Sequence, residues 1–314
     1  MPRNNLVQMT LKYTYFRRII QVNRHFWPLE MVIIRTAPEL RDFLKKERLS
    51  EGLVGFVPTM GALHEGHASL MRQARRDAEV VVLSIFVNPE QFNEKVDFAN
   101  YPITHEADLE LAHNEGVDVV FLPEVSNIYE DSFQAEFSNY GDLTAVFEGA
   151  NRPGHFDGVI SVVRRLFKIV QPDLAFFGEK DLQQLAVIRQ LSKVEFPRTQ
   201  VIGCPLIRHD DGLAMSSRNV RISACDRVHA LKLYSSLLDV VNCSDTQEAL
   251  YVAIDRNRNL LNEDERIELE YFAVVNGGNF QSIKGGELPN ETFVIVAAVV
   301  AGVRLIDNCR LGCS

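Results

Sequence analysis

Short apolar runs alternate along the chain with segments whose apolar residues recur every three or four positions. The apolar runs predict β-strands, and the helical periodicity predicts amphipathic α-helices. We expect strands at residues 32–34, 53–57, 80–87, 117–122, 174–177 and 199–202. We expect helices between them at residues 38–48, 68–78, 106–115, 159–170 and 182–194. This alternation indicates βαβ units, so the predicted fold class is α/β, with a Rossmann-like parallel sheet covered by helices on both faces.

The pattern changes after Cys204. Two expected helices, at residues 226–241 and 246–261, precede strand candidates without intervening helices, at residues 267–275, 293–300 and 303–307. We expect the glycine pairs 277–278 and 285–286 to form the turns between these strands. The sequence therefore predicts a smaller α+β C-terminal domain with an antiparallel sheet. With a boundary near Pro205, the expected domains are residues 31–205 and 206–314, preceded by an N-terminal extension over residues 1–30.

The first thirty residues do not continue this pattern. They contain five basic residues and one acidic residue, Glu30, and they lack an apolar core long enough for a signal peptide or a membrane span. We interpret them as a disordered or loosely docked tail, or as sequence upstream of a true start at Met31. An organelle targeting peptide is a third interpretation, which the lack of serine enrichment disfavours.

Composition and charge limit the class of protein. The 314 residues include 33 basic and 42 acidic side chains, and the net charge of −9 argues against a protein that coats nucleic acid. An apolar share of 46% is that of a globular protein without a membrane partner. The five cysteines are odd in number and scattered, which favours neither a zinc site nor a disulfide framework. We therefore expect a reducing cytosol.

Residues 58–67, PTMGALHEGH, lie where an expected strand passes into an expected helix. Such junctions bind ligands in open α/β sheets, and a helix N-terminus suits phosphate. His64 and His67 allow three interpretations. A metal pair is disfavoured, because the spacing is three rather than four and no third ligand follows. The histidines either cap the helix through its backbone or donate to phosphates whose charge grows in a transition state.

Polar side chains follow two further expected strands. Asn88 and Gln91 come after the strand at 80–87, and Lys180 comes after the strand at 174–177. Each has an ordinary interpretation, as a turn former or a solvated lysine, and Gln183 and Gln184 would then lie on a helix surface. However, the ends of parallel strands share one rim, so we expect these side chains to converge.

Three other segments are rich in polar residues and glycine. Residues 93–101 predict a mobile loop, and residues 148–158, EGANRPGHFDG, are too rich in glycine and charge for a core element. Residues 215–218, MSSR, offer hydroxyls and a guanidinium that suit a polyphosphate. The chain has no P-loop, no GxGxxG and no nucleophile elbow.

Together these segments carry a family resemblance. The motifs PTMGALHEGHASL, FVNPEQF, RPGHFDGV, QPDLAFFGEKDLQQLAVIRQL and DGLAMSSRN occur in the order typical of the pantothenate synthetase (pantoate–β-alanine ligase) family, which the chain resembles. The resemblance covers residues 31–311 and includes RLIDN at residues 304–308. HEGH is similar to the HIGH motif of the nucleotidyltransferase superfamily, and MSSRN is similar to its KMSKS loop.

The resemblance implies an ATP-dependent ligation in two steps. The carboxylate of pantoate attacks the α-phosphate of ATP, which gives pantoyl adenylate and pyrophosphate. The amine of β-alanine then attacks the adenylate, which gives pantothenate and AMP. The family implies a cytoplasmic homodimer in the route to coenzyme A, with ATP as a substrate and Mg²⁺ held mainly by the ATP phosphates rather than by a protein metal site.

The resemblance also implies a role for each matching residue. His67, which matches the proton donor of the family, would be catalytic with His64 and Lys180, and Asp181 would lie near the ribose. Gln91 and Gln184 would hold pantoate, with Gln91 also near β-alanine and Asn88 supporting that side of the pocket. The ATP-binding residues would be Met60, Gly61, Ala62, Leu63, His64, Glu65, Gly66, His67, Gly178, Glu179, Lys180, Asp181, Ile207, Met215, Ser216, Ser217 and Arg218.

The chain departs from the family pattern at Ile103, where an arginine is usual, and near Val220 and Arg221, where an aromatic residue is usual. These departures concern fine substrate contacts. Two other hypotheses remain to be compared: another HIGH-motif nucleotidyltransferase, which would lack the two glutamines, and a catalytically inactive binding or scaffold protein, which would lack His64, His67 or Lys180. All of these residues are present.

Overall fold

The computed structural model describes residues 31–48, 52–92, 98–99, 101–129, 140–243, 246–283 and 288–312. Residues 32–314 group as one compact unit, separate from the first 31 residues. The predicted extension over residues 1–30 lies outside the described residues, as do residues 93–97 and 100 of the predicted mobile loop.

The described residues form a six-stranded parallel sheet in the order β1-β4-β3-β2-β5-β6. Its strands are β1 (Val32–Ile34), β2 (Val54–Thr59), β3 (Val80–Ile85), β4 (Val119–Phe121), β5 (Leu174–Gly178) and β6 (Gln200–Cys204). The six predicted strands are confirmed, with shifts of a few residues at their ends. β3 is buried along its whole length, as a strand covered on both faces should be.

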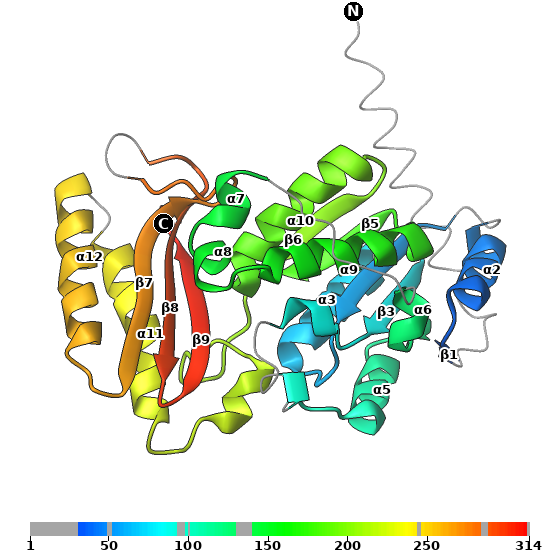
Figure 1. Ribbon diagram of the computed structural model, residues 1–314, viewed down its shortest axis with the longest axis horizontal. Helices are drawn as coiled ribbons and strands as arrows, with labels where there is room; N and C mark the ends of the chain where they lie inside the picture. Colours follow the sequence, from blue (N-terminus) through cyan, green and yellow to red (C-terminus); the bar gives the residue numbers. More distant parts are fainter. Residues whose placement is uncertain are drawn as a thin grey trace, which may run out of the picture. The chain divides into compact units, whose positions relative to one another are not determined.

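Helices cover both faces of this sheet (Figure 1). The long helices are α2 (Ala37–Arg48), α3 (Glu65–Asp77), α5 (His105–Asn114), α9 (His155–Val170) and α10 (Leu182–Glu195). On one face, the ring of Phe56 meets that of Phe167 from α9 edge to face, with centroids 6.3 Å apart. On the other face, a Cβ at Gly55 would lie only 2.8 Å from the Cβ of Ala78, so this glycine admits the close approach of α3.

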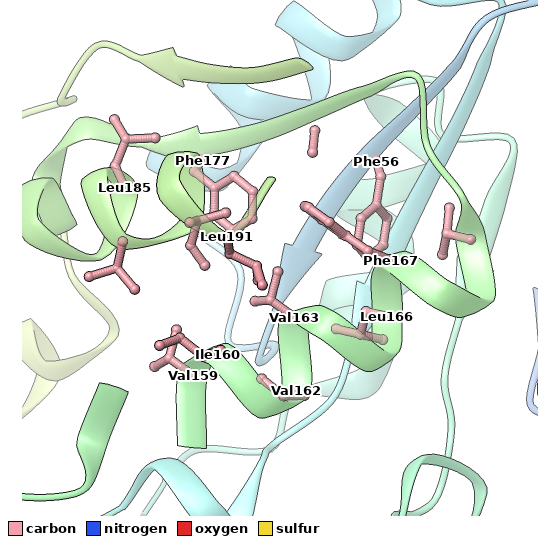
Figure 2. Packing of buried hydrophobic residues seen from close by; sticks show 14 of the residues in the cluster. Phe56, Val159, Ile160, Val162, Val163, Leu166, Phe167, Phe177, Leu185 and Leu191 are labelled. Atoms are coloured by element: carbon pink, nitrogen blue, oxygen red, sulfur yellow. The ribbon is translucent and has the colours of Figure 1, made fainter. Parts of the chain in front are cut away.

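The main core lies between the sheet and helices α2, α9 and α10 (Figure 2). Helix α9 supplies much of it, because its apolar residues recur with helical spacing along a wide stripe. Shorter helical segments connect the larger elements: η2 (Pro89–Gln91), α6 (Val125–Ile128), α7 (Asp142–Ala145), α8 (Glu148–Asn151), η3 (Glu179–Asp181) and η4 (Ser217–Arg221).

A three-stranded antiparallel sheet in the order β7-β8-β9 follows, with two helices packed against it (Figure 1). Its elements are α11 (Arg227–Asn242), α12 (Gln247–Asn262), β7 (Ile267–Asn276), β8 (Thr292–Val300) and β9 (Val303–Arg310). A second core of buried residues lies between these helices and strands. The predicted fold class, a parallel sheet plus an antiparallel C-terminal sheet, is therefore confirmed.

The prediction that glycine pairs separate these strands is wrong for β8 and β9. Both pairs lie between β7 and β8, and residues 284–287 are outside the described residues. Ala301 and Gly302 join β8 to β9, with φ of +48° and +80°. Positive φ at both central positions is the geometry of a tight hairpin turn, which usually carries Asn or Asp before the glycine. Alanine at the first position gave no such signal.

The prediction that residues 148–158 avoid the core is also wrong. They contain α8 and the first turn of α9, and both Glu148 and His155 are buried. Gly158 lies inside α9, where a Cβ would come 2.2 Å from the carbonyl oxygen of Glu90. The glycine therefore allows close packing of α9 on η2, and the buried charge of Glu148 is compensated by partners distant in sequence.

Candidate active site

The ends of two neighbouring strands mark the site. β2 and β5 pair in parallel, yet β2 continues to β3 on one side and β5 continues to β6 on the other. Their carboxyl ends therefore flank a topological switch point, where open α/β sheets bind ligands. β2 leads into residues 60–67, and β5 leads into Lys180. β3, which pairs with β2, brings residues 88–91 to the same edge.

A tight turn joins β2 to α3. Gly61 has φ of +83° and Ala62 has φ of +49°, and both conformations favour glycine. The buried carboxylate of Asp108, on α5, accepts the backbone N–H of Ala62 at 3.0 Å and that of Leu63 at 2.7 Å. Asp108 was not among the residues predicted for the site. Its one signal was an acid four positions before the buried Ala112, on the same helical face.

His64 and His67 form the first turn of α3, which begins three residues earlier than predicted. His64 is the N-cap, and its Nδ1 accepts the N–H of Gly66 at 3.1 Å. The Nδ1 of His67 accepts the N–H of His64 at 3.3 Å, which completes a capping box made of imidazoles. The interpretation of HEGH as a helix cap is therefore confirmed. This cap uses only the Nδ1 atom of each histidine ring.

Both imidazoles are neutral at pH 7. Burial, followed by the charges of Lys180 and His209, lowers the pKa of His64 to about 4. Burial, followed by His64 and Lys180, lowers the pKa of His67 to about 3. Because Nδ1 of each neutral ring accepts a backbone N–H, the ring proton lies on Nε2. Each histidine thus presents a neutral N–H donor, and the rings lie 4.1 Å apart.

Lys180 and Asp181 lie in η3, directly after β5. The ammonium of Lys180 is 3.8 Å from the carboxylate of Asp181. The same ammonium helps to lower the pKa of both histidines, and the parallel pairing of β2 with β5 brings Lys180 to the same edge of the sheet as His64 and His67. Glu65 differs from these residues, because its carboxylate pairs with Arg72 on the exposed side of α3.

The two amides after β3 form a connected pair. Asn88 is buried, accepts the hydroxyl of Tyr129 at 2.8 Å, and donates to the carbonyl of Gly158 at 3.2 Å. Its Nδ2 also lies 3.3 Å from Oε1 of Gln91, and the amide nitrogen of Gln91 contacts the sulfur of Met60. Asn88 thus fixes Gln91 beside the turn that follows β2.

The two glutamines on α10 have different environments. Gln183 is buried and not on the surface, contrary to its ordinary interpretation. Its side chain accepts the N–H of Glu148 at 3.0 Å and donates to the carbonyls of Leu143 and Val146. Both Gln183 and Gln184 line a cavity with Lys180. Gln183 therefore holds the backbone around α7 and α8 at the wall of this cavity, whereas Gln184 is half-buried and makes none of these bonds.

The serine-containing loop, residues 215–218, lies against the start of α3. The N–H of Met215 donates to the carbonyl of Ile207 at 3.0 Å, and Ser216 caps η4. A Cβ at Gly66 would lie 3.8 Å from the Cβ of Met215. The loop also contacts the segment after η2, because Ser217 is hydrogen-bonded to the hydroxyl of Tyr101. Near these segments, Ile103 and Val220 are 69% and 84% exposed.

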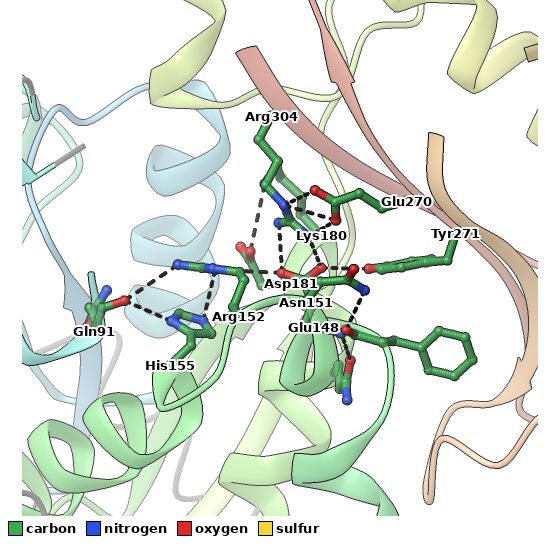
Figure 3. A network of polar contacts seen from close by, with 12 residues as sticks. Gln91, Glu148, Asn151, Arg152, His155, Lys180, Asp181, Glu270, Tyr271 and Arg304 are labelled. Atoms are coloured by element: carbon green, nitrogen blue, oxygen red, sulfur yellow. Dashed lines mark hydrogen bonds and ion pairs between the residues drawn. The ribbon is translucent and has the colours of Figure 1, made fainter. Parts of the chain in front are cut away.

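A buried ion-pair network centred on Glu148 lies beside Lys180 and Asp181 (Figure 3). Its carboxylate accepts from Arg304 at 2.5 and 2.9 Å and from the hydroxyl of Tyr271 at 2.7 Å. Arg304 also binds Glu270, and Arg152 lies 3.6 Å from Glu148. Burial favours a raised pKa for Glu148, but the hydrogen bonds from Arg304 and Tyr271 outweigh it and lower the pKa to about 2.

The same network continues to Gln91 (Figure 3). Arg152 contacts the ring of His155 at 3.0 Å, and His155 Nδ1 lies 2.9 Å from the carbonyl oxygen of Gln91. Burial, followed by the charge of Arg152, lowers the pKa of His155 to about 4. The neutral ring therefore donates from Nδ1 to this carbonyl. Neither residue could be identified from the sequence, because the contacts that connect them to Gln91 span more than sixty positions.

A cleft of about 450 Å³ joins the site at Lys180 and Asp181. Basic side chains from distant parts of the sequence line it: Arg152, Lys180, Arg218, Arg221 and Arg304. The described part of the chain contains no group of three or more metal-ligating side chains. Three carboxylates, of Asp181, Glu270 and Asp307, also line the cleft, so its five cations leave a net positive charge that suits an anionic ligand.

The comparisons with known proteins agree with this geometry. The family model for pantoate–β-alanine ligase matches residues 32–310. A pantothenate synthetase from Cytophaga hutchinsonii is 44% identical over 287 residues, which covers 88% of this chain and 98% of the relative. The crystal structure of pantothenate synthetase from Thermus thermophilus is 40% identical, with a TM-score of 0.83, and 89% of this chain and 99% of that one are covered.

A third comparison includes ligands. The pantoate–β-alanine ligase of Francisella tularensis, described as complexed with β-γ ATP and β-alanine, is 33% identical, with a TM-score of 0.73. The match covers 90% of this chain and 98% of that one. With the matched model, the sequence identity and the shared fold in agreement, the chain belongs to the pantoate–β-alanine ligase family, whose members are ATP-dependent ligases.

Proposed function

We propose that this chain condenses pantoate with β-alanine at the expense of ATP, and that pantothenate, AMP and pyrophosphate are the products. One observation supports this most directly. The switch point between β2 and β5 brings two neutral histidine donors and Lys180 to one edge of the sheet. The family to which the chain belongs carries out this ATP-dependent ligation. A HIGH-motif nucleotidyltransferase that stops at adenylyl transfer is less well supported, because Gln91 and Gln184 are both present.

In the first step, a carboxylate oxygen of pantoate attacks the α-phosphorus of ATP, and the bond to the bridging oxygen of pyrophosphate breaks. Negative charge shifts onto the leaving pyrophosphate. The Nε2–H groups of His64 and His67 and the ammonium of Lys180 stabilise this charge, because they are fixed in place before the reaction begins. We assign Asp181 to the ribose and the backbone of residues 60–67 and 178–181 to the nucleotide.

In the second step, the uncharged amine of β-alanine attacks the acyl carbon of pantoyl adenylate, the bond from that carbon to the phosphate oxygen breaks, and AMP and the proton lost by the amine are released. We assign Gln91 and Gln184 to pantoate, with Gln91 also near the incoming amine. The bonds that Asn88 makes to Gly158 and Tyr129 hold Gln91 in position for this role. A fixed side-chain amide can orient the pantoate hydroxyls at a small entropic cost.

We also propose that the two domains have different roles in the reaction. Residues 31–205 would carry ATP and pantoate, and residues 206–314 would close over them through Ile207 and residues 215–218. Two separate cores support this division, although Val275, Phe280 and Ile295 pack into the first core. Ser216, Ser217 and Arg218 would then reach the triphosphate from the smaller domain.

The remaining partners of the reaction are proposed on less direct grounds. Mg²⁺ would travel with ATP, held mainly by its phosphates, as the family resemblance implies. A homodimer rests on family resemblance. No helix among the described residues is long and apolar enough to cross a membrane. A cytoplasmic location is supported by the four described cysteines, Cys204, Cys225, Cys243 and Cys309, which are unpaired thiols.

The decisive experiment measures AMP and pyrophosphate release from ATP with pantoate and β-alanine, each omitted in turn. We expect no pyrophosphate without pantoate. Without β-alanine, we expect pyrophosphate release to stop after about one equivalent of enzyme-bound adenylate. Pyrophosphate release that is unchanged without pantoate would refute the ligase. Steady turnover without β-alanine would favour the adenylyltransferase instead.

A further inference from the structure

The segment RLIDN on β9 has no role in the reaction as described, yet it contacts three parts of the site. Arg304 binds Glu148 next to the cleft. Asp307 binds Arg208, which lies at the base of the serine-containing loop. Asn308 reaches the turn that carries Lys180. These contacts join residues that are about 100 to 156 positions apart in the sequence.

Asn308 makes the most specific of these contacts. Its side chain is buried, and its amide nitrogen donates to the carbonyl of Glu179 at 2.9 Å and to that of Lys180 at 3.2 Å. Both donor hydrogens of the amide are therefore directed at consecutive carbonyls of η3. Both bonds are partly buried, so this pair of hydrogen bonds fixes the backbone from which Lys180 extends.

The neighbouring ion pair fixes Asn308 itself. Arg208 binds Asp307 with two hydrogen bonds of 2.7 and 2.8 Å, and its guanidinium stacks on the ring of Tyr234 with 3.7 Å to the centroid. Such a two-bond pair constrains direction as well as distance. Asp307 is buried, and its backbone pairs with β8. The strand end that carries Asn308 is therefore rigid.

We propose that Asn308 is a positioning residue for Lys180, which it acts on through the Glu179 and Lys180 carbonyls. The proposal rests on the role of Lys180 in the proposed function. By this contact, the antiparallel sheet sets the direction in which a lysine on the parallel sheet points. Because a misplacement of about 1 Å can cost about a hundredfold in rate, a change at Asn308 should act on turnover more than on ATP binding.

A double-mutant cycle tests this proposal, with pantoate-dependent exchange of pyrophosphate into ATP as the measured rate. The variants are Asn308→Ala, Lys180→Ala and the double variant. We expect Asn308→Ala to lower kcat about 10- to 100-fold and to change the KM for ATP less than about threefold. If Asn308 acts through Lys180, the double variant should be no slower than Lys180→Ala within about twofold.

Arg310→Ala is the matched control. Arg310 lies two positions further along β9 and donates to the backbone carbonyl of Asn290, away from Lys180. Arg310→Ala removes one side-chain bond to a carbonyl, against two in Asn308→Ala, and it does not touch η3, so we expect a wild-type exchange rate. If Asn308→Ala does not fold, the cycle is run with Asn308→Ser, which keeps one donor.

The outcomes distinguish a failure of the proposed role of Lys180 from a failure of the positioning proposal for Asn308. If Lys180→Ala exchanges pyrophosphate at the wild-type rate, the role of Lys180 in the proposed function is wrong. Suppose instead that Lys180→Ala is slow, and that the double variant is slower still by the factor that Asn308→Ala alone loses. Asn308 then acts independently of Lys180, as a general structural residue, and the positioning proposal is overturned. An Asn308→Ala variant with wild-type kcat overturns the positioning proposal alone.

Discussion

His67 and His64 share one hydrogen bond at the start of α3, in which Nδ1 of His67 accepts the backbone N–H of His64 at 3.3 Å. This bond places the ring proton of His67 on Nε2. The same side chain therefore caps a helix with one nitrogen and presents a donor with the other. A structural role and a catalytic role are combined in one residue, so substitutions must be chosen to separate them.

Replacing His67 by asparagine or by glutamine separates the roles of its two ring nitrogens. The amide of glutamine can reach the position of Nε2, whereas the shorter asparagine reaches only that of Nδ1 and so keeps the cap. If catalysis depends on the Nε2–H donor, His67→Gln should keep about tenfold more kcat than His67→Asn. His67→Ala, which lacks both groups, should lose about 3 kcal/mol of transition-state stabilisation.

The measurement is steady-state pyrophosphate release by the three variants, with circular dichroism to confirm that each folds. Equal kcat for the glutamine and asparagine variants, or a faster asparagine variant, would show that capping by Nδ1 is the contribution of His67. Near-normal turnover in the alanine variant would remove His67 from the catalytic group altogether.

The neutral histidines predict a loss of stability in mild acid. An unfolded histidine binds a proton below its ordinary pKa of 6.5, whereas folded His64 and His67 do so only near pH 4 and pH 3. Between pH 6.5 and pH 4 the unfolded chain therefore binds more protons, so the free energy of unfolding falls as pH is lowered. Each histidine contributes at most about 1.4 kcal/mol per pH unit in this range.

Urea denaturation at pH 7, 6 and 5 measures this slope. His155, whose pKa is also lowered to about 4, adds to the wild-type value. His67→Gln should therefore show a shallower slope than the wild type, by up to about 1.4 kcal/mol per pH unit, whatever its stability at pH 7. An identical slope in the two proteins would mean that His67 is protonated in the folded state.

The sequence predicted the parallel sheet well because buried parallel strands are continuous apolar runs. β3 is an example, since Val80–Ile85 is buried at every position. The site was predicted for a related reason. A parallel sheet gathers the residues after its strands on one edge, so His64, Gln91 and Lys180 could be expected together before any distance was known.

The residues that hold the site in place could not be predicted in this way. Asp108, Glu148 and Asn308 act through partners 45 to 156 positions away. No local periodicity records such a pairing, because a buried charge is tolerated only after tertiary structure supplies its partner. For this reason residues 148–158 resembled an exposed loop in the sequence, although Glu148 is the centre of a buried network.

Two glycines allow a test of the turn after β2. Gly61 and Gly154 have nearly the same φ, +83° and +81°, so alanine strains the backbone similarly at both. A Cβ at Gly61 would lie 2.9 Å from Asp108 and 3.1 Å from Ile85, whereas a Cβ at Gly154 has no atom within 4 Å. Gly61→Ala should therefore destabilise the protein by about 1–3 kcal/mol more than Gly154→Ala.

Chemical denaturation of both variants measures this difference, and pyrophosphate release reports on the turn. Gly61→Ala should also slow turnover, because Asp108 can no longer hold the Ala62 and Leu63 amides that precede His64. If the two variants lose equal stability, the close contact with Asp108 does not constrain the turn.

The buried pair of Glu148 and Arg304 predicts an asymmetry between single and double substitutions. Arg304→Ala leaves the Glu148 carboxylate buried without its main partner, and we expect a loss of about 3–5 kcal/mol. The double variant Glu148→Gln with Arg304→Met removes both charges and should recover part of this loss. Arg227→Ala breaks a two-bond pair with Asp211 near the surface, and as a control it should cost only about 1 kcal/mol or less.

Acid unfolding gives an independent measurement of the same pair. The folded pKa of Glu148, about 2, lies below its ordinary value of 4.5, so its stabilising effect is complete above pH 4.5 and is lost as pH falls through 2. This range extends below that of the histidines and overlaps it between pH 4.5 and about 3, so the comparison is made between Arg304→Ala and the wild type, which share the histidines. In Arg304→Ala burial is no longer outweighed, the pKa of Glu148 rises, and the acid-side loss attributable to Glu148 should disappear. A variant that keeps the wild-type profile below pH 4.5 would show that Tyr271 and Arg152 alone hold Glu148 ionised.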